Sequence, residues 1–201
     1  MINRHQFDSP YPLQTKPFSH FDQKYALSAD PWNYRTSWYE QRKYALTIAS
    51  LPRERYRNGY EPACSIGELT KHLATRCDHL LSVDCSAIAV QYAEEATAKL
   101  EHVQIKQAIL PQQIPQDIFD LVVASELLYY FSYKDLSSFL NGIVEHLEPY
   151  GHFICVHWRA RESGYGYDGY NVHSYLTKMS ELVQIIHHDD DNFVLDVMER
   201  R

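Results

Sequence analysis

Two side chains in the second half of the sequence could accept a proton during a reaction. Glu126 comes just after the apolar run Phe119–Ala124, and His157 lies near the end of a later apolar segment. A base within hydrogen-bond reach can take the proton of an amine or a hydroxyl, and imidazole suits this task because it titrates near neutral pH. We therefore consider Glu126 and His157 candidate catalytic bases. The alternatives are a helix-capping or ligand-side contact for Glu126 and a buried, hydrogen-bonded imidazole for His157.

A loop of small residues follows the predicted short strand 57–62. It runs from Glu61 to Gly67, where nucleotide-binding proteins carry a glycine-rich turn, but Ala63 and Ser65 replace two of the three glycines. Small side chains still let a ligand approach the backbone closely, whereas a pyrophosphate needs freely presented backbone amides. The loop therefore favours a ligand without phosphates, although an ordinary strand-to-helix turn could have the same composition.

Asp84 lies 21 residues after Ala63, at the end of the apolar segment 79–84. An acidic residue at the end of the second strand of a nucleotide-binding fold can accept hydrogen bonds from the hydroxyls of a ribose. The alternative is a cap for the helix that begins near Ser86. The spacing from the small-residue loop favours the ribose role.

Aromatic side chains gather after the last two apolar runs that precede residue 160. Tyrosine and tryptophan offer a ring face together with a polar atom, which suits a sugar, a nucleoside or an amine. The segment 163–170 holds three of the seven glycines of the chain and predicts a mobile lid, the alternative being an ordinary surface loop. The candidate substrate-binding residues are Tyr129, Tyr130, Trp158, Tyr165 and Tyr167.

Short apolar segments alternate with helical patterns along the chain, which predicts a single doubly wound α/β sheet. Two closing segments, 182–186 and 193–198, predict an antiparallel hairpin at the carboxyl end, so that we expect a mostly parallel sheet of seven strands. Ligands of such sheets bind outside the carboxyl ends of the parallel strands. These strands are predicted at 57–62, 79–84, 102–106, 119–124 and 152–158, with helices from Leu69, Ser86 and Ser132.

The N-terminal part has a different pattern. Residues 1–29 contain three prolines among polar and aromatic residues and predict a loosely attached arm. Residues 30–51 predict a helical cap, because Asp30 is a suitable N-cap and Pro31 a suitable first helical residue. We therefore expect one domain over residues 30–201, preceded by the arm.

Charge and composition exclude several classes of protein. The net charge is −7, with +4 over residues 1–60 and −11 over residues 61–201, and no basic stripe points to nucleic acid. No run of eighteen apolar residues and no apolar leader occur, so we expect neither a membrane span nor secretion. The acidic turn 187–191 is expected to be solvated, and we expect no metal site. Four cysteines without metal-like spacing favour reduced thiols in the cytoplasm: Cys64, Cys77, Cys85 and Cys155.

Taken together, these features resemble the class I S-adenosylmethionine-dependent methyltransferases. The resemblance rests on Glu61–Gly67, on Asp84, on the segment Phe119–Glu126 and on the turn Pro149–Gly151, and it extends from about residue 30 to the end. Within the class, the chain resembles the NodS-type subfamily, whose namesake N-methylates a glucosamine unit of chito-oligosaccharide signals. The segments that carry this finer resemblance are Asp30–Arg35 with Tyr39–Glu40, Cys64–Gly67, Tyr129–Tyr130 and His157–Trp158.

The resemblance implies S-adenosylmethionine as cofactor and S-adenosylhomocysteine as product. The backbone at Ala63 and Ser65 would face the methionine part, Arg35 would pair with its carboxylate, and Trp32 would cover the cofactor. The alternatives are that Arg35 is an ordinary surface residue and that Trp32 anchors its helix in the core. Relatives often carry an acid for the adenine after the third strand, where this chain has none, so apolar and backbone contacts would hold the ring. The implied cofactor residues are Trp32, Arg35, Glu61, Ala63, Ser65, Gly67, Asp84, Cys85, Ala108, Ile109 and Ser125.

We therefore expect a cytoplasmic methyltransferase that acts on a small polar acceptor, most simply the nitrogen of an amino sugar. Three alternatives stay open. A degenerate fold could act as a binding partner, because the loop has lost two glycines. A nicotinamide-dependent oxidoreductase is disfavoured by the same loop, and a nucleic-acid methyltransferase by the acidic balance beyond residue 60. The oligomeric state is left open.

Overall fold

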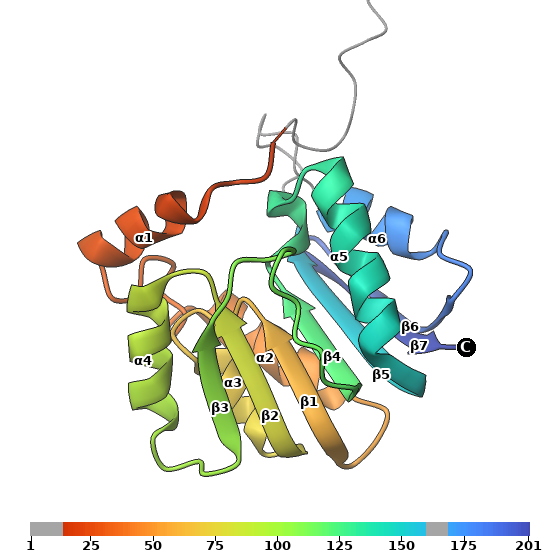
Figure 1. Cartoon of the computed structure of the whole chain (residues 1–201), viewed down its shortest axis with the longest axis horizontal. Helices are drawn as coiled ribbons and strands as arrows, with labels where there is room; N and C mark the ends of the chain where they lie inside the picture. Colours follow the sequence, from red (N-terminus) through yellow and green to blue (C-terminus); the bar gives the residue numbers. More distant parts are fainter. Residues whose placement is uncertain (1–13, 160–168) are drawn as a thin grey trace, which may run out of the picture.

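The computed structural model describes residues 14–159 and 169–201 (Figure 1). Seven strands form one sheet in the order β3-β2-β1-β4-β5-β7-β6. Strands β1 to β5 are parallel, whereas β7 runs antiparallel to both β5 and β6. This confirms the predicted α/β fold with its closing hairpin. The strands are β1 (Tyr56–Pro62), β2 (Cys77–Asp84), β3 (Val103–Gln107), β4 (Phe119–Ser125), β5 (Leu147–Trp158), β6 (Leu182–Asp189) and β7 (Phe193–Arg200).

Helices cover both faces of the sheet, because the central strands are apolar on both sides. Leu121 and Val123 of β4 belong to a buried cluster that also contains residues of α2 (Trp38–Ala49) and α3 (Glu68–Ala74). Val122 and Ala124 belong to the opposite cluster, with residues of α5 (Tyr133–His146) and α6 (Gly169–Leu176). Figure 1 accordingly shows α5 and α6 on the near side of the sheet and α2 and α3 behind it. The remaining long helix, α4 (Ala87–Thr97), contacts β2 and β3.

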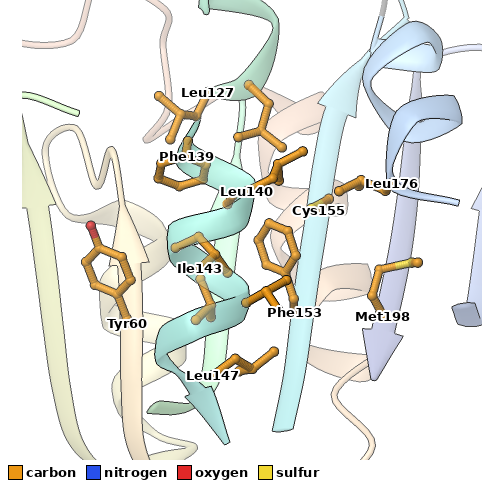
Figure 2. Close-up of a cluster of buried hydrophobic side chains, with 14 of the residues drawn as sticks. Tyr60, Leu127, Phe139, Leu140, Ile143, Leu147, Phe153, Cys155, Leu176 and Met198 are labelled. Atoms are coloured by element: carbon orange, nitrogen blue, oxygen red, sulfur yellow. The ribbon is translucent and has the colours of Figure 1, made fainter. Parts of the chain in front are cut away.

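The α5 helix is the best example of an element that local sequence specifies. The Ser132 side chain accepts a hydrogen bond from the Asp135 amide at 3.2 Å, which satisfies a free donor at the helix start, as the capping pattern predicts. Leu136, Phe139, Leu140 and Ile143 are all at most 1% exposed. Figure 2 shows the side chains of this helix facing Phe153 and Cys155 of β5. The helical spacing of these apolar residues therefore predicts their burial correctly.

The N-terminal prediction is wrong in two respects. The arm contains a helix, α1 (Phe18–Leu27), which contacts α4 at the upper edge of the sheet (Figure 1). Residues 30–37 form turns and bends, and α2 begins only at Trp38. Asp30 does not cap a helix, because its carboxylate closes a turn by accepting hydrogen bonds from the amides of Tyr34 and Arg35 at 2.8 and 3.1 Å. The α6 helix was not predicted, and most of the predicted lid, 163–170, lies outside the described residues.

In the described part of the chain, no helix has the length and apolar character that crossing a membrane requires. The four cysteines are free thiols, and three of them are buried.

Gly67 lies at the N-terminus of α3 with a φ of 80°, a conformation that favours glycine. A Cβ atom there would lie 3.1 Å from the Ala93 Cα atom, so α4 also blocks a side chain. We expect Gly67→Ala to lower the free energy of unfolding by about 1–3 kcal/mol, since strain and overpacking add. Denaturant unfolding measures this change. The control is Gly142→Ala in α5, where only the flexible Ile114 side chain is in the way; equal losses in both variants would contradict the explanation.

Candidate active site

A cleft opens at the carboxyl ends of β1, β2 and β4, where the strand order changes direction. Such a switch point is the usual ligand site of an open α/β sheet. The structure therefore brings together the strand ends that the sequence analysis singled out, and it adds α1 as a wall. The cleft is lined by the predicted residues Trp32, Glu61, Ala63, Ser65, Asp84, Cys85, Ala108, Ile109, Ser125, Glu126 and Tyr130, and by Phe21, Tyr25 and Tyr34 from the N-terminal segment.

The small-residue loop has an unusual backbone. Ala63 and Ser65 both have positive φ values, 62° and 53°, in the left-handed region that non-glycine residues rarely adopt. Tertiary contacts hold this conformation: the Cys64 amide donates to the Val83 carbonyl at 2.8 Å, and the Ser65 amide donates to Asp84 at 2.9 Å. The Ser65 hydroxyl also lies 2.5 Å from the Tyr25 hydroxyl of α1. Backbone strain of this kind is typical of ligand sites.

Asp84 ends β2 and is buried at the floor of the cleft. One carboxylate oxygen accepts the Ser65 amide and the other accepts the Ser86 amide, each at 2.9 Å. Burial raises the pKa of Asp84 above its ordinary value, although these backbone donors oppose the effect. The amide and the thiol of the neighbouring Cys85 also donate to this carboxylate. The cap of α4 is the Ser86 side chain, which accepts from the Ala89 amide, so the capping alternative is wrong for Asp84, which instead holds the amides of Ser65 and Ser86.

Glu61 is near the end of β1, and its side chain binds residues of α3 and β2. One carboxylate oxygen accepts from the Thr70 hydroxyl at 2.6 Å and from the Ser82 hydroxyl at 2.7 Å. Complete burial raises the pKa of Glu61 to about 7, against the effect of these two donors. Glu61 therefore joins β1 to α3 and β2, and it also reaches the wall of the cleft.

Glu126 follows β4 with a φ of 53° and accepts hydrogen bonds from four groups. One oxygen binds the Tyr39 hydroxyl at 3.0 Å and the Lys43 ammonium at 2.5 Å. The other binds the Tyr129 hydroxyl and the Trp158 amide, the latter at 3.0 Å. Burial alone would raise the pKa of Glu126, but Lys43 and these donors hold it below its ordinary value. An ionised carboxylate with four donors is a weak base, so the geometry does not support the catalytic role predicted for it.

Lys43 is the main residue of the cleft that the sequence analysis missed. Its side chain is 1% exposed, and its ammonium group contacts Glu40 and Glu126 and lies 4.7 Å from the centre of the Tyr39 ring. Tyr39 and Lys43 are four residues apart on α2, so the helical spacing could have indicated a shared face. Arg35, which the resemblance implied for the cofactor carboxylate, instead pairs with Glu68 at 3.4 Å and is half exposed. Lys43 is therefore a buried cation in the wall of the cleft, whereas Lys16 lines its other part.

His157 has no free lone pair for a substrate. The ring is completely buried, its Nε2 atom accepts from the Leu128 amide at 3.0 Å, and its Nδ1 atom lies 3.0 Å from Nε2 of His173. Burial, together with the nearby His173 and Lys43, lowers the pKa of His157 well below its ordinary value. The prediction of a catalytic base at His157 is thus not supported, and the alternative of a buried, hydrogen-bonded imidazole describes it.

Of the predicted aromatic residues, Trp32 and Tyr130 line the cleft, whereas Tyr129 and Trp158 contact Glu126 but are not among the residues that line it. Trp32 packs edge-on against Tyr25 with ring centres 5.5 Å apart, so it anchors α1 and also lines the cleft. Tyr129 and Tyr130 belong to a short 3-10 helix, η1 (Leu128–Tyr130), and their rings are 4.7 Å apart. Trp158 is 45% exposed at the end of β5. Tyr165 and Tyr167 lie outside the described residues.

The N-terminal segment is attached across the cleft at two points. The Lys16 amide donates to the Tyr130 carbonyl at 2.9 Å, and the Ser132 amide donates to the Thr15 hydroxyl at 2.9 Å. Further along, Tyr25 is 4% exposed and packs with Ile66 and Ala89. Residues 14–27 therefore form a roof over the cleft, which the prediction of a loose arm did not foresee.

The strand order, the switch-point cleft and the acid at the end of β2 define the fold of the class I S-adenosylmethionine-dependent methyltransferases. A family model described as nodulation protein S (NodS) matches residues 20–163. The chain therefore belongs to the NodS family.

Individual relatives agree with this assignment. Nodulation protein S of Sinorhizobium fredii (strain NBRC 101917 / NGR234) is 28% identical over 129 residues, which are 62% of this chain and 59% of the relative. Among solved structures, a Pseudomonas syringae protein assigned as a methyltransferase is 40% identical, with a TM-score of 0.73 over 82% of this chain and 100% of that one. The N-methyltransferase NodS of Bradyrhizobium japonicum WM9 in complex with S-adenosylhomocysteine has a TM-score of 0.81 at 23% identity, over 91% of this chain and 97% of that one. The chain spans less than two thirds of the length of the curated nodulation proteins that it matches.

Proposed function

We propose that this protein transfers a methyl group from S-adenosylmethionine to the nitrogen of a small polar acceptor, with an amino sugar of an oligosaccharide as the leading candidate. The observation that carries the proposal is the 2.9 Å hydrogen bond between the Ser65 amide and Asp84. It joins the small-residue loop and the strand-end acid at one point of the cleft, where a nucleoside and an amino acid can be bound side by side. Membership of the NodS family supports the same activity.

The residues present fit this cofactor. Asp84 would accept the ribose hydroxyls, because it ends β2 and lines the floor of the cleft. Ala63 and Ser65, with their left-handed backbone, would contact the methionine part of the cofactor. Lys43 lines the same pocket as the loop and would balance the charge of the methionine carboxylate. When bound, S-adenosylmethionine supplies a sulfonium methyl group that an acceptor lone pair can attack in line. The apolar residues on the adenine side would be Ala108, Ile109, Leu110, Leu127 and Phe131.

The charge of the cleft argues against a dinucleotide. Five acidic groups, Glu40, Glu61, Glu68, Asp84 and Glu126, line the part next to the loop, where Lys43 is the one lysine among the described lining residues. Carboxylates so close to the loop would repel a pyrophosphate, whereas they favour the amino group of methionine and a cationic acceptor. This supports S-adenosylmethionine over a nicotinamide cofactor.

The acceptor nitrogen must carry a lone pair when it attacks. Since Glu126 and His157 have their acceptor atoms engaged, we propose that the amine loses its proton to water before it is positioned. The contribution of the protein is then alignment of the nitrogen with the methyl group and exclusion of water. Tyr130, which lines the cleft, and Trp158, whose amide binds Glu126, are both partly exposed and would bind the sugar ring on its faces.

We further propose that residues 30–201 are the catalytic domain and that residues 14–27 roof the bound cofactor. The acidic balance supports a small-molecule substrate over nucleic acid. The four free thiols support a cytosolic location for the reaction.

Calorimetric titration of the full chain tests the cofactor assignment. We expect S-adenosylhomocysteine to bind and NAD not to bind, because the cleft offers ribose and adenine contacts but repels a pyrophosphate. Binding of NAD alone would favour an oxidoreductase. The acceptor is tested with chitosan oligosaccharides that carry a free amine, using fully N-acetylated oligomers as the control and mass spectrometry to detect methylation. Binding of S-adenosylhomocysteine without transfer to any amine would instead indicate a binding module.

A further inference from the structure

Three buried side chains on three different elements form a chain of hydrogen bonds that ends at the Leu128 amide, next to the cleft-lining Leu127. Asp196 of β7 binds Nδ1 of His173 at 2.6 Å, Nε2 of His173 lies 3.0 Å from Nδ1 of His157, and Nε2 of His157 accepts from the Leu128 amide at 3.0 Å. The three side chains are between 0 and 3% exposed. None of them lines the cofactor cleft; His173 and Asp196 line a separate pocket on the other side of α6, whereas His157 lines none of these pockets.

The position of each proton along this series of hydrogen bonds can be derived from its last donor, the Leu128 amide. A backbone amide can only donate, so Nε2 of His157 carries no proton. Neutral His157 must then carry its proton on Nδ1 and donate it to Nε2 of His173. His173 must in turn carry its proton on Nδ1 and donate it to Asp196. Each tautomer thus follows from the next hydrogen bond along the chain.

Other groups around the chain agree with these protonation states. The second oxygen of Asp196 accepts hydrogen bonds from Gln184 and from His187, each at 2.6 Å. Burial alone would raise the pKa of Asp196, but the donors from His173, His187 and Gln184 hold it below its ordinary value, so that the side chain is an ionised acceptor. On the other side, the Lys43 ammonium disfavours a charged His157.

A glycine allows the helix to come close enough for the pair of histidines to meet. Gly169 is the first residue of α6, and a Cβ atom there would lie 2.6 Å from the Cβ atom of His157 and 2.8 Å from the Trp158 carbonyl oxygen. Any larger residue would push α6 away from β5. The close approach at Gly169 is therefore independent support for a built contact between α6 and His157.

The last hydrogen bond of this series fixes the backbone of η1. Leu128 is the first residue of η1, which begins two residues after the strained Glu126 and carries Tyr129 and Tyr130. The Tyr129 hydroxyl donates to Glu126, and its ring lies 5.3 Å from the ring of His157. Because η1 is a single turn, the position of its amide at Leu128 governs where both tyrosines stand.

We propose that Asp196 and His173 are positioning residues for the acceptor side of the cleft: they impose one tautomer on His157, which then holds the Leu128 amide and, with it, η1. The proposal rests on the proposed function in that the tyrosines of η1 are taken as the acceptor wall. If Nε2 of His173 gained a proton, that proton would point at the proton on Nδ1 of His157. If His157 exchanged its tautomer, its Nε2 proton would point at the Leu128 amide, so that two donors would meet. The chain therefore holds η1 only in this one arrangement.

Nuclear magnetic resonance of the full chain labelled with nitrogen-15 tests the arrangement without any acceptor. We expect both His157 and His173 in the Nδ1–H form, with a scalar coupling across the hydrogen bond from the Leu128 amide to Nε2 of His157. A proton on Nε2 of either ring would overturn the proposal. This measurement uses the unmodified protein, so it does not depend on whether any variant folds.

Substitution of His173 tests the positioning role. We expect His173→Phe to speed hydrogen exchange of the Leu128 amide by at least about tenfold and to raise the KM for a free-amine chitosan oligosaccharide by about fivefold, the effect of one lost hydrogen bond. Affinity for S-adenosylhomocysteine should stay within about twofold, because the cofactor residues are not touched. His173→Gln, whose amide oxygen can accept from His157, should restore both properties, and Ser174→Ala on the same helix is the matched control.

Unchanged Leu128 exchange in folded His173→Phe, or an equal effect of Ser174→Ala, would overturn the positioning role. If the unmodified protein binds S-adenosylhomocysteine but methylates no chitosan amine, the proposed acceptor is wrong, whereas the tautomers and the Leu128 exchange still decide on the chain of hydrogen bonds. The two failures are therefore distinguishable.

Discussion

Replacement of Asp84 by alanine is expected to weaken S-adenosylhomocysteine binding by at least about tenfold, the scale of one or two hydrogen bonds to a charged group. This loss of affinity should be larger than the loss caused by removing the ribose contacts alone. Asp84 also accepts the Ser65 and Ser86 amides, so its removal frees the left-handed loop that would contact the methionine part. Asp84→Asn, which keeps one carbonyl acceptor, should give an intermediate loss. Calorimetric titration measures both affinities.

The matched control for this prediction is Asp78→Ala. Asp78 lies near the other end of the same strand, is 46% exposed in its side chain, and pairs with Arg55 at the surface. We expect no change in affinity for this variant. An unchanged affinity in folded Asp84→Ala, as verified by thermal unfolding, would exclude Asp84 from cofactor binding.

Replacement of Lys43 by methionine is expected to lower the free energy of unfolding by about 3–5 kcal/mol at neutral pH, because it leaves buried carboxylates without their cation. Lys43 is 1% exposed and contacts Glu126 at 2.5 Å and Glu40 at 2.9 Å. Without the ammonium, burial would dominate at both acids, and the pKa of Glu126 should move from below its ordinary value to above it. Urea unfolding measures the loss.

The pH dependence of this variant has a definite sign. A carboxyl group whose pKa is raised in the folded state binds its proton more tightly there than in the unfolded chain. The loss in the free energy of unfolding of Lys43→Met is therefore complete above the raised pKa. It becomes smaller as the pH falls towards the ordinary carboxyl pKa of about 4.3. We expect the difference between the original protein and Lys43→Met to be smaller at pH 5 than at pH 8. A deficit that is independent of pH would contradict the ion-pair explanation.

Lys71→Met is the control for burial. Lys71 also pairs with a glutamate three residues away, Glu68, at 2.6 Å, but its side chain is 39% exposed. A solvent-exposed pair of this kind contributes about 1 kcal/mol or less, so this variant should be nearly as stable as the original protein. A second check is Lys43→Met combined with Glu126→Gln, which removes the unbalanced charge and should recover part of the lost stability.

The central strands β4 and β5 were predictable because their apolar runs reflect burial on both faces. The segment 119–124, for example, became β4 with one added residue, since alternate side chains enter opposite clusters of the core. Caps were predictable for a similar reason, because the Ser86 and Ser132 side chains act on amides three residues away. Interactions within a few residues can be recognised from spacing alone.

The N-terminal region was not predictable in this way. Asp30 and Pro31 suggested the start of a helix, but the Asp30 carboxylate closes a turn, and Asn33 takes a left-handed conformation with a φ of 59°. The α1 helix has a polar sequence with weak periodicity and becomes stable through packing of Tyr25 on the loop and on α4. Tertiary packing commonly overrides local propensity in such short helices.

The candidate site divides along the same line. By itself, the sequence determined that Ala63, Ser65 and Asp84 meet at one edge of a parallel sheet, because the topology of an α/β fold follows from its alternating pattern. Only the tertiary structure decided the protonation of the groups around them. Lys43 comes from α2 and keeps Glu126 ionised, whereas His173 and Asp196 come from α6 and β7 and keep His157 neutral and engaged. The ability to accept a proton depends on burial and on partners distant in the chain, and neither can be derived from residue type or spacing.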